Sequence, residues 1–469
     1  MEMQLYNTDG REAQTFKPIE EGKAGLYCCG PTVYNYAHIG NMRPYTIQDV
    51  LKRALTYFGY DVNHVMNITD VGHLTDDGDE GEDKMIKAAR EKGMSVWDIA
   101  RFFEDAFWKD LERLNISRPT VSCRATDHIQ DMIDMISTLE EKGYTYISGG
   151  NVYFDTSKFP EYGKMALLDR QELKEGARVG VDENKRNYTD FVLWFTKSKF
   201  ENQAMVWDSP WGKGYPGWHI ECSAMSSKYL GPHFDFHCGG IDHVPVHHTN
   251  EIAQSEAANG CKWVNYWVHN EFILMKTGKM SKSKGNFLTI QSLVDEGYDA
   301  LDYRYLLLGG HYRSQLVFSW ESLDGARSAR ESLVRKIKAL LEESQAAAEL
   351  NEKALVYMKD FEQHLADDLN TPRCLADIWS LLKDKELGAD QKLALIFKMD
   401  GLLGLKLEEE ASREEEKVSL DGEIEALIEE RNQARKDKNF ARSDEIRDEL
   451  LARGIKIIDT PQGTTWEKV

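Results

Sequence analysis

The first third of the chain alternates short apolar runs with amphipathic ones. Gly25 to Cys29 is apolar and ends at Gly30-Pro31, which predicts a buried strand followed by a turn. Apolar positions three and four apart from Tyr45 to Phe58 predict a helix, and Asp61 to Thr69 predicts a second strand. Strands and helices in alternation favour an α/β fold built on a doubly wound parallel sheet.

This alternation stops and then returns. The segment from Tyr144 to Phe154, broken by Gly149-Gly150, predicts a hairpin, and the α/β rhythm is absent from there to about residue 201. We therefore expect a domain inserted between two halves of the sheet. The rhythm resumes with a helix, a strand, a helix and a strand, predicted at Trp218–Leu230, His233–Cys238, Val246–Asn259 and Trp263–His269.

Beyond about residue 287 the pattern becomes helical. Long amphipathic runs from Ala326 to Leu350 and from Ala354 to Leu365 predict an all-α bundle. Residues 408–416 contain six Glu, which favours a linker. A charged helical hairpin (Leu420 to Arg453) and a strand-like tail (Ile455 to Asp459) then predict a small α+β domain.

Composition adds limits to this picture. With 469 residues the chain is too long to form a single hydrophobic core, and it contains no apolar stretch long enough to span a membrane. Its seven cysteines are scattered without a C-x-x-C pair, which favours a reducing cytoplasm. The net charge of −21 argues against indiscriminate nucleic-acid binding. A local basic patch is still present between residues 431 and 442. It contains one acidic residue and five basic ones, Arg431, Arg435, Lys436, Lys438 and Arg442.

Two segments carry candidate nucleotide chemistry. The first predicted strand leads into His38-Ile39-Gly40-Asn41, where a glycine at a helix N-terminus lets backbone N–H groups approach phosphate oxygens. Lys279-Met280-Ser281-Lys282-Ser283 places two lysines in a Gly-flanked loop suited to a polyphosphate. Each segment alone also fits an ordinary surface loop.

A third set consists of dispersed metal-ligating residue types. His247 and Glu251 are four apart on a predicted helix, so both side chains share one face. Cys222 lies on another predicted helix, and Cys29 ends the first strand. Thiolates, imidazole and carboxylate are all zinc ligands, but a lone buried cysteine is more often a small apolar residue, and spacing alone leaves both readings open.

The motifs His38 to Asn41 and Lys279 to Ser283, in this order, resemble the nucleotide signatures of class I aminoacyl-tRNA synthetases. The residues around them resemble cysteinyl-tRNA synthetases. The segments Gly217 to Met225, His247 to Glu251, His311 to Leu316 and Asp459 to Trp466 extend this resemblance along essentially the whole chain. The family motif usually reads His-Ile-Gly-His, so Asn41 is a departure, and we expect altered efficiency rather than loss of function.

The resemblance implies a Rossmann-like catalytic domain and a domain order. The expected segments are a catalytic domain in two halves (1–117 and 202–286), an inserted domain (118–201), a stem-contact region (287–325), a helical bundle (326–407), an acidic linker (408–417) and an anticodon-binding domain (418–469).

Site roles also follow from the resemblance. His38, Asn41, Lys279 and Lys282 would act in catalysis. ATP, with Mg²⁺, would contact Thr32, His38, Gly40, Asn41, Gly240, Asp242 and Lys282. Substrate cysteine would contact Gly30, Thr69 and Trp218, and one Zn²⁺ bound by Cys29, Cys222, His247 and Glu251 would recognise its sulfur. The basic patch becomes a candidate tRNA surface, whereas His237, His243 and His248 receive no role.

The function implied is a cysteine–tRNA ligase that forms cysteinyl-adenylate from L-cysteine and ATP and transfers the cysteine to tRNA(Cys). We expect a cytoplasmic monomer without a membrane partner. Two alternatives stay open: a cysteine–aminosugar ligase of the mycothiol type, and a non-catalytic tRNA-binding paralogue. The C-terminal module disfavours the first, and the complete lysine and metal positions disfavour the second.

Overall fold

The computed structural model describes residues 2–72, 84–168, 183–197, 205–276, 287–344, 349–413, 417–437, 439–460 and 463–468. The chain divides into two compact units, Met1–Glu408 and Glu409–Val469. In the described part of the chain, no helix is both long and apolar enough to cross a membrane.

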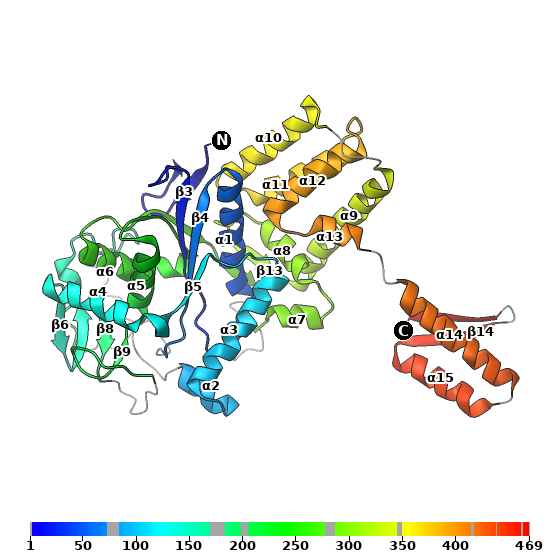
Figure 1. The fold of residues 1–469 in the computed structure, drawn as a ribbon, viewed down its shortest axis with the longest axis horizontal. Helices are drawn as coiled ribbons and strands as arrows, with labels where there is room; N and C mark the ends of the chain where they lie inside the picture. Colours follow the sequence, from blue (N-terminus) through cyan, green and yellow to red (C-terminus); the bar gives the residue numbers. More distant parts are fainter. Residues whose placement is uncertain are drawn as a thin grey trace. The chain divides into compact units, whose positions relative to one another are not determined.

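A five-stranded parallel sheet forms the centre of the first unit (Figure 1). Its strand order is β11-β10-β3-β4-β5, which confirms the predicted doubly wound α/β fold. The order reverses between β3 and β10, so a crevice opens beyond the carboxyl ends of these two strands. The strands are β3 (Lys23–Cys28), β4 (Asp61–Ile68), β5 (Val121–Arg124), β10 (Phe234–Gly240) and β11 (Val264–Asn270).

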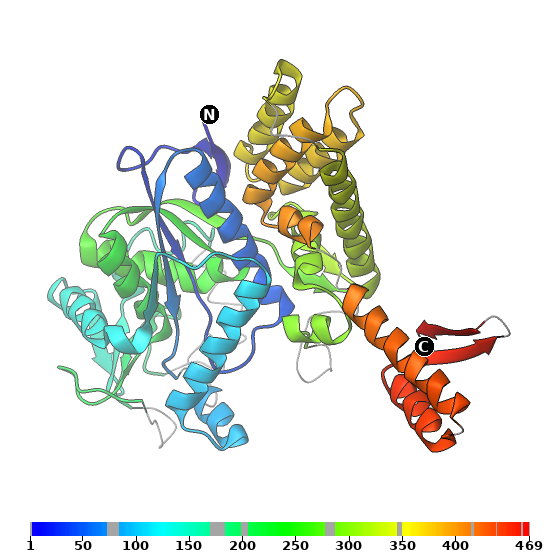
Figure 2. The same ribbon diagram turned by 45° about the vertical axis from the view of Figure 1, so that its right-hand side comes forward.

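Helices cover both faces of this sheet. Helix α1 (Ile39–Tyr57) packs on β4, β10 and β11, and α5 (Trp218–Leu230) packs on β3 and β4 from the other face (Figures 1 and 2). The helices α4 (Ile129–Glu141) and α6 (Thr249–Asn259) pack on α5. The predicted bounds of α5 are confirmed, but α6 begins three residues later than expected, because Val244–His248 forms a π-helical turn.

A second sheet interrupts the parallel one. It is antiparallel, with the order β6-β7-β8-β9, and its first two strands confirm the predicted hairpin. The strands are β6 (Thr145–Ser148), β7 (Asn151–Phe154), β8 (Phe191–Phe195) and β9 (Tyr215–Pro216). Its last strand lies beyond residue 201, where the sequence places the end of the inserted domain.

Further elements lie around the two sheets. They are β1 (Gln4–Asn7) and β2 (Glu12–Thr15), α2 (Lys84–Lys92), α3 (Val96–Arg113), β12 (Ile273–Met275) and β13 (Leu316–Phe318). Strands β12 and β13 pair in parallel.

The rest of the first unit is helical, as predicted. Part of the acidic segment that the sequence assigns to a linker is the helix α13, since Leu407 is buried and its N–H donates to the Asp400 carboxylate at 2.7 Å. The helices of the first unit are α7 (Ile290–Asp295), α8 (Ala300–Leu308), α9 (Trp320–Glu343), α10 (Glu352–Ala366), α11 (Thr371–Lys383) and α12 (Ala389–Leu403). Helix α13 (Leu407–Ser412) spans the boundary between the two units.

A buried arginine joins this helical part to the sheet. The Arg304 guanidinium, on α8, donates to the carbonyl of Leu403 at 2.7 Å and to that of Leu114 at 2.8 Å. It also pairs with the Asp49 carboxylate of α1 at 2.6 Å. One side chain thus links α1, the end of α3 and the end of α12.

The second unit is a helical hairpin with a two-stranded antiparallel sheet. The predicted hairpin is confirmed as α14 (Lys417–Lys436) and α15 (Phe440–Ala452). The strand-like tail is β14 (Ile455–Thr460), and its partner β15 (Gly463–Lys468) was not predicted. The unit has its own apolar core, made of Ile424, Ile428, Ile446, Leu450 and Ile455.

Candidate active site at the sheet switch point

A cavity of about 830 Å³ opens where β3 and β10 end. Residues from every described part of the predicted site line it, namely Cys29, Gly30, Thr32, His38, Gly40, Asn41, Thr69, Trp218, Cys222, Gly240, Asp242 and His247. Glu251 is fully buried beside these residues. Lys279 and Lys282 lie outside the described residues.

His38 and Asn41 cap helix α1 reciprocally. The Asn41 N–H donates to Nδ1 of His38 at 3.2 Å, and the His38 N–H donates to Oδ1 of Asn41 at 3.0 Å. Because Nδ1 accepts, Nε2 carries the proton in the neutral imidazole. The α1 N-terminus therefore presents an N–H donor on His38 and the positive end of the helix dipole to the cavity.

Gly30 lies where the chain leaves the sheet and has no room for a side chain. A Cβ added at Gly30 would meet the carbonyl oxygen of Asn67 at 1.6 Å. The Gly30 N–H donates to Oδ1 of Asn67 at 2.8 Å, and Nδ2 of Asn67 donates to Oγ1 of Thr69 at 3.1 Å. The Thr69 hydroxyl in turn donates to the buried Glu221 carboxylate at 2.9 Å. This network fixes the carboxyl ends of β3 and β4 against each other.

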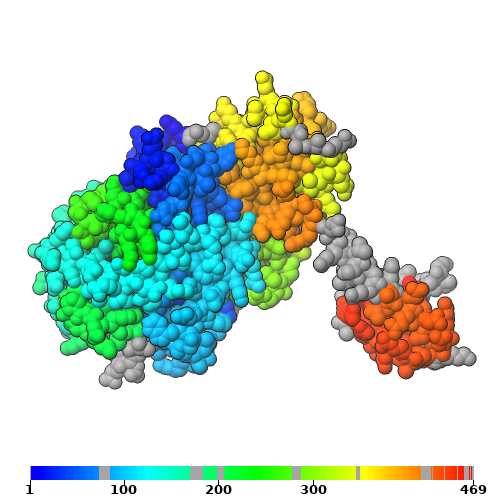
Figure 3. Space-filling model, in the orientation of Figure 1, coloured from blue at the N-terminus to red at the C-terminus, as the bar shows by residue number. Residues whose placement is uncertain are grey.

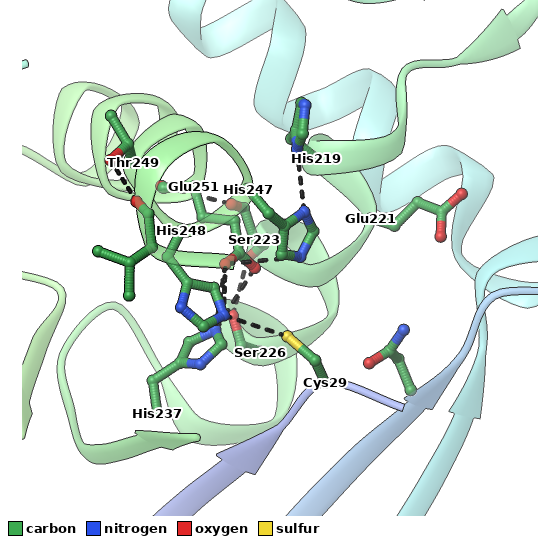
Figure 4. A network of polar contacts seen from close by, with 12 residues as sticks. Cys29, His219, Glu221, Ser223, Ser226, His237, His247, His248, Thr249 and Glu251 are labelled. Atoms are coloured by element: carbon green, nitrogen blue, oxygen red, sulfur yellow. Dashed lines mark hydrogen bonds and ion pairs between the residues drawn. The ribbon is translucent and has the colours of Figure 1, made fainter. Parts of the chain in front are cut away.

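The predicted metal ligands converge on one point. Figure 4 shows three of them, Cys29, His247 and Glu251. Ligand atoms of Cys29, Cys222, His247 and Glu251 all lie within 4.8 Å of one another. A second set that satisfies the same limit shares Cys29 and Glu251 but replaces the other two residues by His237 and His248. Both sets are buried throughout.

The π-helical turn before α6 explains why two consecutive histidines reach this point. Nε2 of His247 and Nε2 of His248 lie 3.7 Å and 3.8 Å from Oε2 of Glu251 (Figure 4). Successive residues of an α-helix point about 100° apart. The wider π-turn at Val244–His248 lets both imidazoles face the same carboxylate.

Further hydrogen bonds orient these imidazoles. Nδ1 of His247 lies 2.9 Å from Nδ1 of His219, and the Trp218 ring lies 4.8 Å from the His247 ring. Nε2 of His248 lies 3.5 Å from Sγ of Cys29. On its other side, Nδ1 of His248 lies 2.7 Å from Nε2 of His269. The imidazoles of His247 and His248 are therefore both held from behind.

Burial sets the protonation of the cluster. It lowers the pKa values of His237, His247 and His248 well below the ordinary histidine range, so these rings are neutral and offer lone pairs. Burial also raises the pKa of Glu251 to about 7, although His247 opposes this effect, and raises the pKa of Cys29. A cation at the centre would reverse the preference of the acidic groups for the protonated form.

Arg43 holds one wall of the cavity. Its buried guanidinium donates to the carbonyl groups of Glu271 at 2.8 Å and Phe272 at 2.7 Å, both of which belong to residues that line the cavity. It also donates to the carbonyl of Ser314 at 2.6 Å. The first turn of α1 binds the chain again after residue 286, where the Ile39 N–H donates to the carbonyl of Leu288 at 2.8 Å.

Several of these residues were missed by sequence reasoning. Arg43, Asn67, His219 and Glu221 were not singled out, and His237 and His248 received no role. One available signal was the density of histidine, since seven of the 13 histidines lie between His219 and His269. Nothing in the sequence distinguishes a buried arginine such as Arg43 from the exposed ones.

Only some side chains of the basic patch in the second unit are accessible to solvent. Arg435 and Lys436 are exposed, and Arg442 is half-buried and pairs with Glu430 and Glu445. Arg431 is only 7% exposed, because it continues the inward stripe of Ile424 and Ile428 on α14. The prediction of Arg431 as a surface contact is therefore wrong. Lys438 lies outside the described residues.

Known protein families match both units. Residues 15–328 match the family of class I (C) tRNA synthetase catalytic domains, and residues 417–466 match the cysteinyl-tRNA ligase anticodon-binding domain.

Full-length relatives agree with these matches. The cysteine–tRNA ligase of Treponema denticola is 53% identical, with 100% of both chains covered. That of Borreliella burgdorferi is 47% identical over 99% of each chain.

The fold resembles those of solved synthetases. Mycobacterium tuberculosis methionyl-tRNA synthetase with methionyl-adenylate has a TM-score of 0.55 at 16% identity, covering 83% of this chain and 91% of that one. Agrobacterium radiobacter leucyl-tRNA synthetase in a ternary complex with tRNA has a TM-score of 0.60 at 12% identity, covering 85% and 86%. The relatives, the matched families and the switch-point cavity agree, and the chain belongs to the cysteinyl-tRNA synthetase family of class I tRNA synthetases.

Proposed function

We propose that this protein is a cysteine–tRNA ligase, which activates L-cysteine with ATP and transfers it to the 3′-terminal adenosine of tRNA(Cys). One observation carries the proposal: the His38-capped helix and the Cys/His/Glu cluster line or adjoin one cavity. A nucleotide site and a sulfur-recognising site within the same cavity fit the joining of cysteine to AMP. The full-length cysteine–tRNA ligase relatives support the same reaction.

In the first step, a carboxylate oxygen of cysteine attacks the α-phosphorus of ATP, and pyrophosphate leaves. Nε2–H of His38 and the amide of Asn41 stabilise charge on the phosphate oxygens. Thr32, Gly40, Gly240 and Asp242 line the place proposed for the nucleotide. Lys279 and Lys282 are proposed to pair with the β- and γ-phosphates, and Mg²⁺ is proposed to bind the phosphates as well.

In the second step, a terminal ribose hydroxyl of the tRNA attacks the carbonyl carbon of the adenylate, and AMP leaves. This step needs no protein nucleophile, because orientation and charge stabilisation supply the acceleration. Gly30, Thr69 and Trp218 are proposed to contact the amino acid, at the rigid junction of β3 and β4. The exposed Arg435 and Lys436 and the half-buried Arg442 are the proposed tRNA contacts of the second unit.

The donor set fits zinc. Two cysteine sulfurs, a neutral imidazole and a carboxylate, all buried and within 4.8 Å of one another, match the ligands and the four-coordinate sites that Zn²⁺ prefers. We propose that Cys29, Cys222, His247 and Glu251 hold the ion. When bound, the ion supplies a soft Lewis acid that favours the sulfur of cysteine over the oxygen of serine.

We infer that the enzyme works as a cytoplasmic monomer. The seven cysteines are free, as in a reducing compartment.

Two activity assays test the function. We expect the purified protein to catalyse cysteine-dependent exchange of pyrophosphate into ATP and to charge tRNA(Cys) with labelled cysteine. Exchange without charging, but with transfer to an aminosugar, would instead indicate the mycothiol-type ligase. Absence of exchange would indicate a non-catalytic paralogue.

Metal analysis of variants tests the ligand set. We expect about one zinc per chain by elemental analysis, and loss of zinc in Cys222→Ser and His247→Ala. Cys261→Ser, at an exposed cysteine, serves as the control and should retain zinc. If His237→Ala abolished zinc binding while His247→Ala retained it, the ion would instead use the set that contains His237 and His248.

A further inference from the structure

A buried hydroxyl group lies beside the metal cluster. Tyr27, on β3, is fully buried, and in the part of the chain that the structure describes its hydroxyl forms no hydrogen bond. By contrast, the equally buried Tyr303 donates its hydroxyl proton to the carbonyl of Ile39 at 2.8 Å. A buried hydroxyl without a partner lowers the stability of a fold. Packing of the Tyr27 ring therefore does not explain why this residue carries a hydroxyl.

The strand and the helix above it bring Tyr27 next to two of the proposed metal ligands. Cys29 follows Tyr27 by two residues, the spacing that places two side chains on one face of a strand. Helix α5, which carries Cys222, packs on β3. Tyr27, Cys29, Cys222 and Cys123 all belong to one buried cluster of the core. The Tyr27 ring also lies 5.1 Å from the ring of His237.

The neighbours of the Tyr27 hydroxyl are thiols. Burial raises the pKa of Tyr27 well above the ordinary tyrosine range, and the thiol of Cys222 raises this pKa further, ahead of those of Cys123 and Cys29. The hydroxyl therefore keeps its proton and can donate it. A neutral thiol is a weak acceptor, whereas the thiolate that binds a metal is a strong one. A metal-bound sulfur at Cys222 would complete the missing hydrogen bond.

The surroundings of Cys222 favour such a donor. Helix α5 lies between the sheet and the helices α4 and α6, and Figure 3 shows the cyan and green segments that contain α4 and α6 packed into one surface. Cys222 is only 2% exposed, so its sulfur has little contact with water. Two thiolates and a carboxylate would bring three negative charges to a divalent ion, and the substrate sulfur would add a fourth. A hydrogen-bond donor inside the protein offsets this excess where water cannot.

We propose that Tyr27 is a positioning residue of the metal site, whose hydroxyl donates a hydrogen bond to the Cys222 sulfur when that sulfur binds zinc. This proposal rests on the proposed function, because it starts from the zinc site, and it adds a residue that tunes the metal without touching it. The hydrogen bond withdraws electron density from the sulfur, so the ion remains a stronger Lewis acid toward the sulfur of the substrate.

The test measures stability and zinc affinity of the full-length protein, with zinc bound and after its removal by a chelator. Tyr27→Phe removes only the hydroxyl. Without zinc, the variant should be as stable as wild type or slightly more stable, because an unpaired buried group is lost. Its zinc affinity should fall ~10-fold or more. Excess zinc should then stabilise the variant against urea by about 1.4 kcal/mol less than it stabilises wild type.

Tyr303→Phe is the matched control. It removes a hydroxyl that is equally buried but already has a partner. This variant should lose stability to the same extent with and without zinc, and should keep the zinc affinity of wild type.

Cobalt gives a second readout, which a purely structural role would not change. With Co²⁺ in place of zinc, the sulfur-to-metal charge-transfer absorption of Tyr27→Phe should move to longer wavelength, because a sulfur without the hydrogen bond is a stronger electron donor. Tyr303→Phe should give the wild-type spectrum. Equal stability losses with and without zinc, or an unchanged zinc affinity and cobalt spectrum, would overturn this proposal alone. If wild type bound no zinc, the proposed metal site would fail and this proposal with it.

Discussion

At the scale of single residues, Asn41 shows how a departure from a family motif can be accommodated. Its side-chain oxygen accepts the His38 N–H at 3.0 Å, and its own N–H donates to the His38 ring. An asparagine at this helix position therefore keeps the cap and fixes the tautomer of His38. Its amide group still carries two N–H donors for phosphate oxygens.

Two substitutions at Asn41 separate the cap from the chemistry. Asn41→Ala should lower the free energy of unfolding by about 1 kcal/mol, because the His38 N–H loses the Asn41 side chain as its acceptor while the backbone N–H at position 41 still donates to the His38 ring, and should slow pyrophosphate exchange. Asn41→Asp keeps the acceptor, so stability should stay near that of wild type, while the added negative charge near the phosphates should still slow exchange. Urea unfolding and exchange kinetics measure both effects. Equal exchange rates in Asn41→Asp and wild type would contradict the role in phosphate binding.

The sequence predicted the metal-ligand residues better than it predicted the residues that surround them. Cys29, Cys222 and His247 were assigned through the resemblance, and the structure brings their ligand atoms together with that of Glu251. The competing set with His237 and His248 could not be anticipated, because it depends on a π-helical turn that no residue spacing announces. Arg431 was misjudged because the local sequence does not show which face of α14 turns inward, and a cation can lie on either face.

At the scale of secondary-structure elements, α1 supports both ends of the segment that contains the predicted lysine loop. Arg43 binds the chain at Glu271 and Phe272, before this segment, and Ile39 binds it at Leu288, after it. The helix that His38 caps therefore binds the described chain on both sides of residues 277–286.

Replacing Arg43 tests this arrangement. Arg43→Lys cannot reproduce the planar fork that binds several carbonyl groups, so the cavity wall should shift. We expect the KM for ATP in pyrophosphate exchange to rise ~10-fold or more, with a smaller change in the KM for cysteine. Arg53→Lys, on the same helix but with contacts to Asn115 and Gly401 away from the cavity, is the matched control. Equal ATP effects in the two variants would exclude a specific role for Arg43.

Helix α1 also carries a carboxylate whose ionisation supports the fold. Burial alone would raise the pKa of Asp49, but Arg304, Arg53 and hydrogen bonds from Ser117 outweigh it and lower the pKa to about 2. The folded pKa lies below the usual value of 3.8, so the stabilisation is complete above about pH 4 and is lost as the pH falls to 2.

Asp49→Asn should therefore change stability in a pH-dependent way. At pH 6 the variant should be less stable than wild type, and the difference should shrink by about 2 kcal/mol between pH 4 and pH 2. Unfolding by urea at several pH values measures this difference. A difference that stays constant over this range would show that Asp49 acts through packing rather than through charge.

The order of elements was more predictable than their pairing. Apolar runs such as Gly25 to Cys29 identify the strands, and the alternation with helices identifies the parallel sheet. Short partners such as β9 and β15 were missed, because two to six residues of strand carry little pattern of their own. The end of the inserted sheet depends on such a partner.

At the scale of the whole molecule, the two units divide the proposed reaction. The cavity and the cluster lie entirely in Met1–Glu408, and Glu409–Val469 has a separate apolar core. The sequence anticipated this division from the acidic run, although part of that run is helical.

A chain that ends at Arg413 tests the division. It keeps α13 and should retain pyrophosphate exchange within about twofold, because no residue of the described cavity is removed. Its kcat/KM for charging tRNA(Cys) should fall ~10-fold or more and should depend less on salt, since phosphate contacts are lost. Exchange that falls together with charging would show that the second unit supports the fold of the first.

Arg304 has a consequence for how the first unit opens. Its guanidinium binds the main chain at Leu114 and Leu403 and the side chain of Asp49, so none of these three stretches can detach without stranding a buried cation. The amide protons of the last turn of α3 and those of the last turn of α12 should then exchange with deuterium at similar, slow rates, as one cooperative block. The sheet and the helices that follow it would melt as a single foldon.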